Sequence, residues 1–99
     1  MITRIVKMEF NNENTSDFLI FFDGISDQIS NFSGCQGMTL MKDIKNPNII
    51  FTYSKWDNHD SLENYRKSDL FLIVWPKVKQ WFSNKPQAWS LESHYDGFK

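Results

Sequence analysis

The chain has 99 residues, of which 40% are hydrophobic and 23% are charged, with only four glycines and three prolines. This length and composition predict one folded domain over residues 1–99, without a disordered segment or a flexible linker. Eleven Lys and Arg residues against 12 Asp and Glu residues leave a formal charge of −1, which disfavours nucleic acid and anionic membranes as partners.

The first ten residues alternate between charged and apolar side chains, unlike a secretory signal peptide. The chain has no apolar stretch near the ~20 residues that cross a bilayer. Cys35 is the single cysteine, so an internal disulfide is impossible, and a reducing cytoplasm is the simplest location. We expect Cys35 to pack as a small buried hydrophobic residue rather than to act as a nucleophile.

The alternation of residues 2–10 predicts a first strand, because apolar side chains occupy every second position. An amphipathic helix is predicted next. Asn14 and Asp17 have the spacing of a capping box at its beginning, and Gly34 is placed to close it. Its apolar side chains recur every three or four residues: Phe18, Phe22, Ile25, Ile29 and Phe32.

Two runs rich in β-forming residues, 36–43 and 48–56, flank the turn sequence 45–48, which predicts a hairpin. A short helix is predicted over residues 58–66, beginning at Asn58, because asparagine is a favourable N-cap residue.

Ser68 and Asp69 predict the beginning of another helix. Its apolar stripe consists of Phe71, Val74, Val78 and Phe82. Pro76 lacks a backbone donor and is predicted to interrupt this helix, so that Trp75 lies at a kink that turns its ring away from the stripe.

Residues 86–95 predict a last strand, with Trp89 on one face and His94 on the other. The order β, α, β, β, α, β is that of the ferredoxin-like α+β fold, in which helices cover one face of an antiparallel sheet. Bulky residues nevertheless occupy both faces of the predicted third strand, for example Phe51 and Trp56. We therefore expect a homodimer formed sheet to sheet, around an aromatic-lined cavity.

Four short segments carry a family resemblance. They are Phe32-Ser33-Gly34-Cys35, Asn46-Pro47-Asn48, Lys55-Trp56-Asp57 and Ser61-Leu62-Glu63-Asn64-Tyr65-Arg66-Lys67-Ser68. Together they resemble the antibiotic biosynthesis monooxygenase family of dimeric α+β barrels, over nearly the whole chain. The resemblance implies a homodimer with one pocket per subunit, between the sheet and the helices. Some members oxidise polycyclic phenols with molecular oxygen and no bound cofactor, and others degrade haem.

The haem-degrading members carry an Asn on the first strand, a Trp in the first short helix and a His ligand in the next helix. Residues 2–10 contain no Asn, and the two helix positions correspond to Tyr65 and Trp75. An indole nitrogen cannot ligate iron, so haem degradation is not expected. Many oxygenase members carry a His at the position of Tyr65 and an acidic residue near Ser54, and this chain departs from that pattern too.

Tyr65 and His94 are the candidate catalytic residues. The family position of Tyr65 faces the pocket, where its protonated hydroxyl could donate to a phenolate; otherwise it is a packed aromatic residue. His94 either lies at the surface or lines a cavity at the dimer interface. His59 is expected at the surface, and neither histidine belongs to a metal-binding spacing, so no metal is predicted.

Arg4, Trp56, Phe71 and Trp75 are the candidate substrate-binding residues. Arg4 shares the parity of the apolar side chains on its strand and could hold an anionic substrate, or else reach solvent along its stem. The aromatic residues could line the pocket or belong to the core.

Three functions are compatible with this reading to different degrees. The first is a monooxygenase without a cofactor, acting on a phenol or quinol in an apolar pocket. The second is a dimeric binding module that holds a small hydrophobic aromatic ligand without converting it. An RNA-binding sheet of the same topology would need exposed aromatic residues among basic ones, and the net charge disfavours it.

Overall fold

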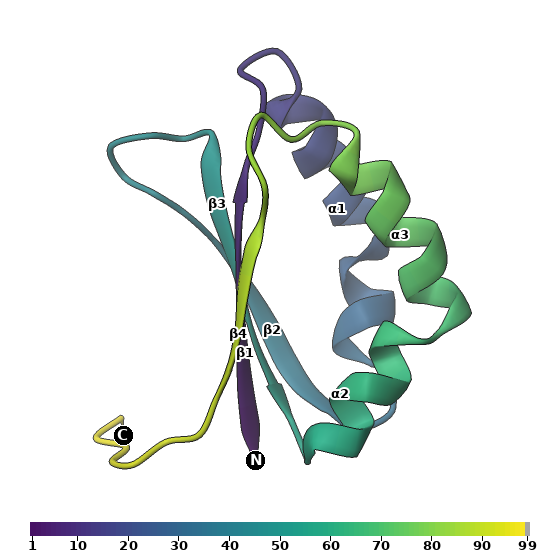
Figure 1. Cartoon of the computed structure of the whole chain (residues 1–99), viewed down its shortest axis with the longest axis vertical. Coiled ribbons are helices and arrows are strands. Elements are labelled where there is room, and N and C mark those ends of the chain that lie inside the picture. Colours follow the sequence, from purple (N-terminus) through teal and green to yellow (C-terminus); the bar gives the residue numbers. More distant parts are fainter. Residues whose placement is uncertain (99) are drawn as a thin grey trace.

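Four strands form one antiparallel sheet in the order β2-β3-β1-β4, and three helices cover one of its faces (Figure 1). The computed structural model describes residues 1–98. The elements are β1 (Ile2–Glu9), α1 (Thr15–Ser30), β2 (Cys35–Lys42), β3 (Ile49–Trp56), α2 (His59–Arg66), α3 (Asp69–Lys79) and β4 (Gln87–Leu91). This arrangement confirms the predicted ferredoxin-like α+β fold. No helix in the described part of the chain is long and apolar enough to span a membrane.

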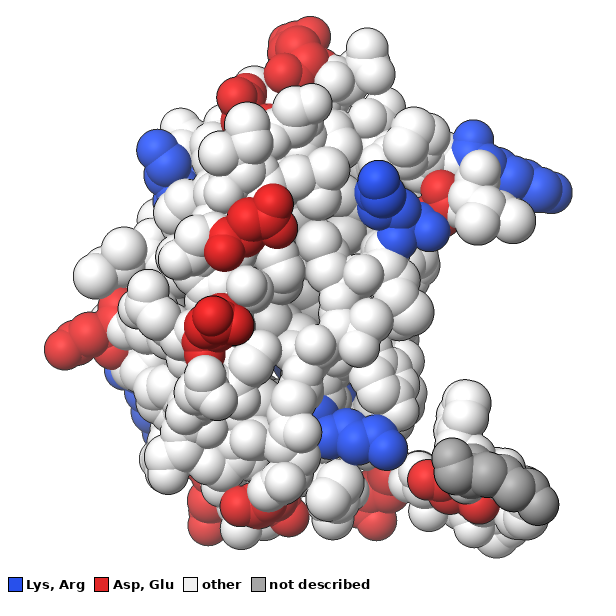
Figure 2. Space-filling view, turned by 180° about the vertical axis from the view of Figure 1, so that it is seen from behind, with Lys and Arg blue, Asp and Glu red and all other residues white. Residues whose placement is uncertain are grey.

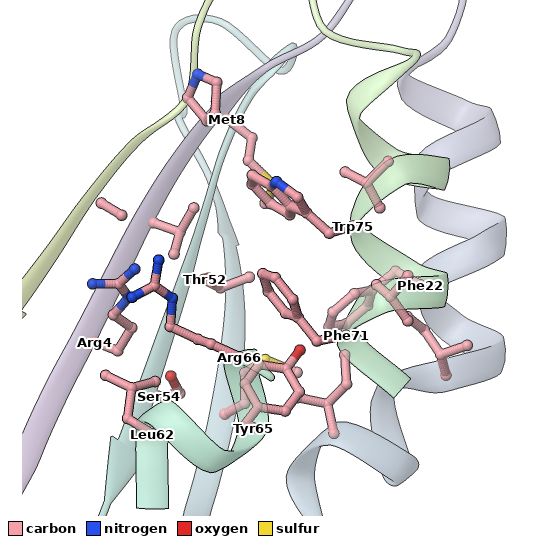
Figure 3. Close-up of a pocket in the computed structure, with 18 of the residues that line it drawn as sticks. Arg4, Met8, Phe22, Thr52, Ser54, Leu62, Tyr65, Arg66, Phe71 and Trp75 are labelled. Atoms are coloured by element: carbon pink, nitrogen blue, oxygen red, sulfur yellow. The ribbon is translucent and has the colours of Figure 1, made fainter. Parts of the chain in front are cut away.

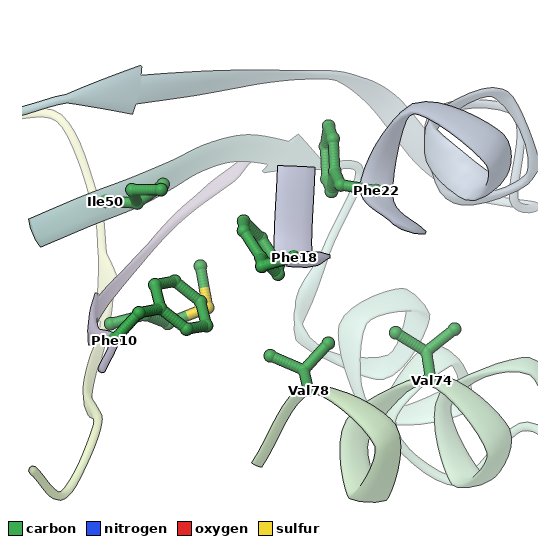
Figure 4. Close-up of a cluster of buried hydrophobic side chains, with 7 residues drawn as sticks. Phe10, Phe18, Phe22, Ile50, Val74 and Val78 are labelled. Atoms are coloured by element: carbon green, nitrogen blue, oxygen red, sulfur yellow. The ribbon is translucent and has the colours of Figure 1, made fainter. Parts of the chain in front are cut away.

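The core lies between the helices and the sheet face formed by the even-numbered residues of β1 and β3. Strand register places Met8 directly beside Ile50, and these side chains are 3% and 0% exposed. Phe18 and Phe22 of α1 and Val74 and Val78 of α3 pack onto them, with Phe10, as Figure 4 shows. Burial of each such side chain stabilises the fold by about 1.5–3 kcal/mol, so these apolar stripes hold the helices on the sheet.

The predicted capping box of α1 does not form, because the side chain of its N-cap residue makes no hydrogen bond to the first turn's backbone. The Asn14 side chain caps no backbone amide, and its Nδ2 instead donates to Asp17 Oδ2 at 3.1 Å. The helix ends at Ser30, four residues before Gly34. Gly34 has a φ of +86°, and a Cβ there would lie 2.4 Å from the Ser61 side chain. Glycine is therefore needed where the turn into β2 contacts α2.

The two short helices begin where the sequence predicts. Asn58 Oδ1 accepts from the amide of Ser61 at 2.9 Å, and Ser68 Oγ accepts from the amide of Phe71 at 3.1 Å. Each cap satisfies a backbone donor that the first helical turn leaves free.

The prediction that Pro76 interrupts its helix is wrong, because α3 continues through it to Lys79. Pro76 lies on the exposed side of α3, and Leu72, whose carbonyl loses its usual donor, is 61% exposed. Water can therefore satisfy that carbonyl while the helix continues.

The last strand is shorter than predicted, because β4 ends at Leu91 rather than near residue 95. Leu91 pairs with Thr3, close to the beginning of β1, so residues beyond it have no strand to pair with. The C-terminal segment instead leaves the body of the protein (Figure 1).

The sheet face opposite the helices is uncovered in the single chain, as Figure 1 shows. Its strands place Ile5, Tyr53 and Trp89 in one row across β3, β1 and β4. Trp89 is 41% and Leu91 is 42% exposed on this face. Elsewhere, the surface seen in Figure 2 is mostly uncharged, with acidic and basic groups scattered over it.

Candidate functional site

A cavity of about 270 Å³ lies between the helices and the sheet, beside the core. The inner faces of β1, β2 and β3 line it on one side, and α1, α2 and α3 line it on the other (Figure 3). Its walls are predominantly apolar, with a few polar groups gathered near α2 and the beginning of β1. Such a combination is typical of sites for small apolar ligands with one polar end.

Four aromatic residues of the cavity lining contact one another in a chain, and Figure 3 shows three of them, Tyr65, Phe71 and Trp75. Trp56, at the end of β3, stacks on Tyr65 of α2 with ring centroids 5.0 Å apart. Phe71 meets Tyr65 edge to face at 5.3 Å and stacks on Trp75 at 5.7 Å, with only 12° between the planes. Phe71 and Trp75 are one helical turn apart, so α3 alone brings their rings onto the same side.

The strand register produces a polar row at one end of the sheet. Arg4 of β1 lies directly between Ser54 of β3 and Ser90 of β4. Arg4 Nη1 donates to Ser90 Oγ at 3.0 Å. Ser54 is buried, and its Oγ accepts from the indole Nε1 of Trp56 at 3.0 Å. Since that bond uses Ser54 as acceptor, the hydroxyl proton of Ser54 stays available to donate elsewhere.

Arg66 of α2 also lines the cavity, and Figure 3 shows its guanidinium group and that of Arg4 pointing toward one another. Glu63 pairs with Arg66 at 3.0 Å, and both side chains are partly exposed. Burial lowers the pKa of Arg4, and the positive charge of Arg66 lowers it further. Arginine stays charged at neutral pH, so two cations meet at this end of the cavity.

Tyr65 keeps its proton over the whole neutral range. Burial is the main cause that raises the pKa of its hydroxyl to about 12, and the neighbouring Cys35 contributes the smaller part of this rise. Among the described residues, none accepts a hydrogen bond from this hydroxyl. Tyr65 is therefore a hydrogen-bond donor in this cavity and is unsuited to act as a base.

The cavity lining contains no histidine, cysteine, aspartate or glutamate. Within residues 1–98, no three such side chains converge into a group that could hold a metal ion. The cavity itself thus offers donors and apolar surface, and a proton acceptor must come from the substrate or from solvent.

Known proteins share the sequence profile and the fold of this chain. A family profile described as antibiotic biosynthesis monooxygenase matches residues 1–73. The chain belongs to this family. The matched range includes both arginines, Trp56, Tyr65 and Phe71, and it ends just before Trp75. A comparison with curated proteins gave no match.

Solved structures share the fold at low sequence identity. The crystal structure of an antibiotic biosynthesis monooxygenase superposes with a TM-score of 0.88 at 14% identity, covering 94% of this chain and 98% of that one. Rv0793 from Mycobacterium tuberculosis gives 0.88 at 12% identity, with 98% of both chains covered. A conserved protein from Methanosarcina mazei Go1 gives 0.85 at 18%, covering 92% of this chain and 91% of that one. These likenesses establish the fold of the family for this chain.

The structure brings together five of the six residues that the sequence nominated. They are Arg4, Trp56, Tyr65, Phe71 and Trp75, and all line the cavity. His94 does not join them, because it follows the end of β4 in the exposed C-terminal segment. His59 is exposed at the beginning of α2, as expected.

Cys35 is half-buried rather than buried, so the predicted burial is wrong in degree. Burial is the main cause that raises the pKa of its thiol, which favours the unreactive protonated form.

Sequence reasoning missed Ser54 and Arg66. Ser54 has the same strand parity as Trp56, two residues later, so its place on the inner face followed from the alternation. Arg66 directly follows Tyr65, and the chain has only one other arginine, Arg4. A long arginine can reach a cavity from an exposed backbone position, and that reach is invisible to helical periodicity.

Proposed function

We propose that this protein is a monooxygenase that binds an electron-rich phenol or quinol in the cavity and oxidises it with molecular oxygen, without a bound cofactor. The observation that carries the proposal is an apolar cavity lined by six aromatic rings, with two guanidinium groups and protonated hydroxyls at its polar end and no carboxylate or imidazole in the described lining. Membership in the antibiotic biosynthesis monooxygenase family supports an oxygenase reaction.

The aromatic wall orients the substrate rings. Phe71 and Trp75 are nearly parallel, and together with the Trp56 and Tyr65 pair they present flat apolar surfaces to the cavity. Stacking on such surfaces fixes a planar ligand and displaces water from its reacting carbon. Exclusion of water protects a reactive oxygen adduct from side reactions and strengthens the polar contacts that hold the anion.

The donor groups favour the ionised form of the substrate. A phenol or quinol that loses a proton spreads the negative charge over its rings and becomes able to reduce oxygen. Tyr65, held protonated by its raised pKa of about 12, donates a hydrogen bond to the developing oxyanion. The proton itself passes to solvent at the open end of the cavity, because no carboxylate or imidazole lines it.

An anthrone illustrates the balance of the reaction. Its CH₂ carbon loses two hydrogens and gains one oxygen atom from O₂ as a new carbonyl. The second oxygen atom leaves with the two hydrogens as water. The carbon loses four electrons and dioxygen accepts four, so the substrate supplies every electron and no external reductant is required.

The second candidate function is a binding module that holds the same class of ligand without turnover. The absence of a carboxylate or an imidazole from the cavity lining favours it, because general-base catalysis then depends on solvent.

Oxygen uptake separates the two functions. With a panel of hydroquinones and anthrones, the wild-type protein is expected to consume oxygen faster than the enzyme-free solution. Trp75→Ala removes half of a stacked pair and should reduce the rate about tenfold or more, and Tyr65→Phe should lower it by removing the donor. Leu72→Ala, on the exposed side of α3, is the matched control and should leave the rate unchanged. Tight binding of the panel without oxygen uptake would instead establish the binding module.

A further inference from the structure

We infer that the natural ligand of this cavity is an aromatic acid, whose rings stack against Phe71 and Trp75 and whose carboxylate lies between Arg4 and Arg66. The inference rests on the proposed function, since it takes the cavity as the site of an aromatic ligand. It adds the class of the ligand, which the oxygenase reaction itself does not require.

The distribution of arginine in the chain is the first observation. The chain has two arginines and nine lysines, and both arginines line this cavity while none of the eight lysines within residues 1–98 does. Arginine presents a planar fork of donors that matches a carboxylate, whereas lysine is a point charge. Two arginines from separate elements, β1 and α2, converge here although like charges repel each other.

The second observation is that Arg4 is held in place without a counter-charge. Its Nη1 donates to the neutral hydroxyl of Ser90 at 3.0 Å, and within residues 1–98 no carboxylate lies at ion-pair distance from it. Glu63 is engaged with Arg66 instead. The cavity end therefore carries one positive charge more than its own side chains balance. A bound anion supplies the missing charge.

The third observation is that hydrogen-bond donors predominate at this end of the cavity. Both guanidinium groups can only donate, and Tyr65 stays protonated. Ser54 Oγ accepts from Trp56 Nε1, which leaves its hydroxyl proton free to donate to a ligand. A carboxylate offers two oxygen atoms with about four acceptor positions and no donor, which complements this set.

The volume of the cavity limits the number of rings in the ligand. A dry apolar cavity of roughly 150 Å³ holds one benzene ring. The cavity within one protein chain measures about 270 Å³, which gives room for two fused rings and a carboxylate. The sheet determines which way the ligand lies. The apolar row of Met8 and Ile50 is at the end that would hold the rings, and the row of Arg4 and Ser54 is at the end that would hold the carboxylate.

Three naphthalene probes of one shape and different charge test the inference. Calorimetric titration at pH 7 compares 2-naphthoate, 2-naphthalenemethanol and 2-naphthylmethylammonium on the full chain. We expect 2-naphthoate to bind about tenfold tighter than the neutral alcohol, or more, on the scale of a charge-assisted hydrogen bond. The cation should bind most weakly. Raising the salt concentration should weaken the binding of naphthoate and leave that of the alcohol nearly unchanged.

Variants then test whether the two arginines cause the preference for naphthoate over the alcohol. Arg4→Gln and Arg66→Gln should each remove most of it, and binding of the alcohol should persist. Lys67→Gln is the matched control, because it removes the same charge from the residue next to Arg66 but outside the cavity lining. The salt dependence of the wild-type protein gives an independent reading if Arg4→Gln does not fold.

Equal binding of naphthoate and the alcohol, or a preference that survives in both arginine variants, would overturn the inference. In that case the proposed function stands, because the cavity still binds aromatic rings. Failure of all three probes to bind would overturn the inference and the proposed aromatic site together.

Discussion

At the scale of single residues, the candidate site was predictable where a family position or strand parity marked it. Trp56, Tyr65 and Trp75 came from family positions, and Arg4 from its parity with Val6. His94 was misplaced because parity says nothing about where a strand ends. Trp75 lines the cavity one helical turn after Phe71, on a helix that continues through Pro76.

Tyr65 gives a prediction on pH. Its folded-state pKa of about 12 lies above the ordinary value of 10, so between these values the folded state holds a proton that the unfolded state loses. The stabilisation is thus present below about pH 10 and is lost as the pH rises through 12. Urea unfolding should show stability falling over this window, less steeply in Tyr65→Phe.

Tyr95 provides the control for this experiment, because it is 84% exposed in the C-terminal segment. Tyr95→Phe should leave the wild-type slope intact. Identical slopes for Tyr65→Phe and the wild-type protein would show that Tyr65 is not desolvated in the folded state.

At the scale of elements, apolar periodicity, β-forming runs and cap residues together predicted every helix and strand, and apart from the interruption at Pro76 the errors concern their ends. Periodicity reports which face is buried, whereas the end of β4 depends on its register with β1, which no local pattern reveals. Arg66 escaped prediction for a related reason, since its backbone lies on an exposed helical position while its side chain reaches the cavity.

Gly34 tests the packing of α2 on the turn before β2, and Gly24 in α1 provides a comparison. Gly34→Ala should destabilise the fold by more than about 1 kcal/mol, because its φ of +86° and the contact with Ser61 both oppose a side chain. Gly24 lies within α1, and a Cβ there meets nothing within 4 Å. Gly24→Ala should therefore stabilise the protein by roughly 0.5–1 kcal/mol.

Urea midpoints of the two variants provide the measurement. A neutral or stabilising Gly34→Ala would contradict the close approach of the turn to α2.

At the scale of the whole molecule, we propose that the uncovered sheet face forms a homodimer. Trp89 and Leu91 are each about two-fifths exposed there, beside Ile5 and Tyr53, and contiguous apolar surface of this kind marks an interface. The sequence indicated this through bulky residues on both faces of β3. It did not indicate the area that is buried, because that depends on the partner.

Light scattering tests the dimer directly. The wild-type protein should have twice the chain mass of 11.8 kDa, and Trp89→Lys should shift it toward the monomer by placing a charge in the interface. Leu72→Lys, on the exposed side of α3, should remain dimeric. A wild-type mass of one chain would refute the proposal.

The central claim is that an aromatic substrate is oxidised by molecular oxygen in the cavity. Isotope labelling tests this claim most directly. Anthrone is oxidised under ¹⁸O₂ by the wild-type protein and by Trp75→Ala, and the product is analysed by mass spectrometry. We predict one labelled oxygen atom in the new carbonyl, formed well above the enzyme-free rate by the wild-type protein and near that rate by the variant. Equal rates for both proteins, or a carbonyl oxygen derived from water, would contradict it.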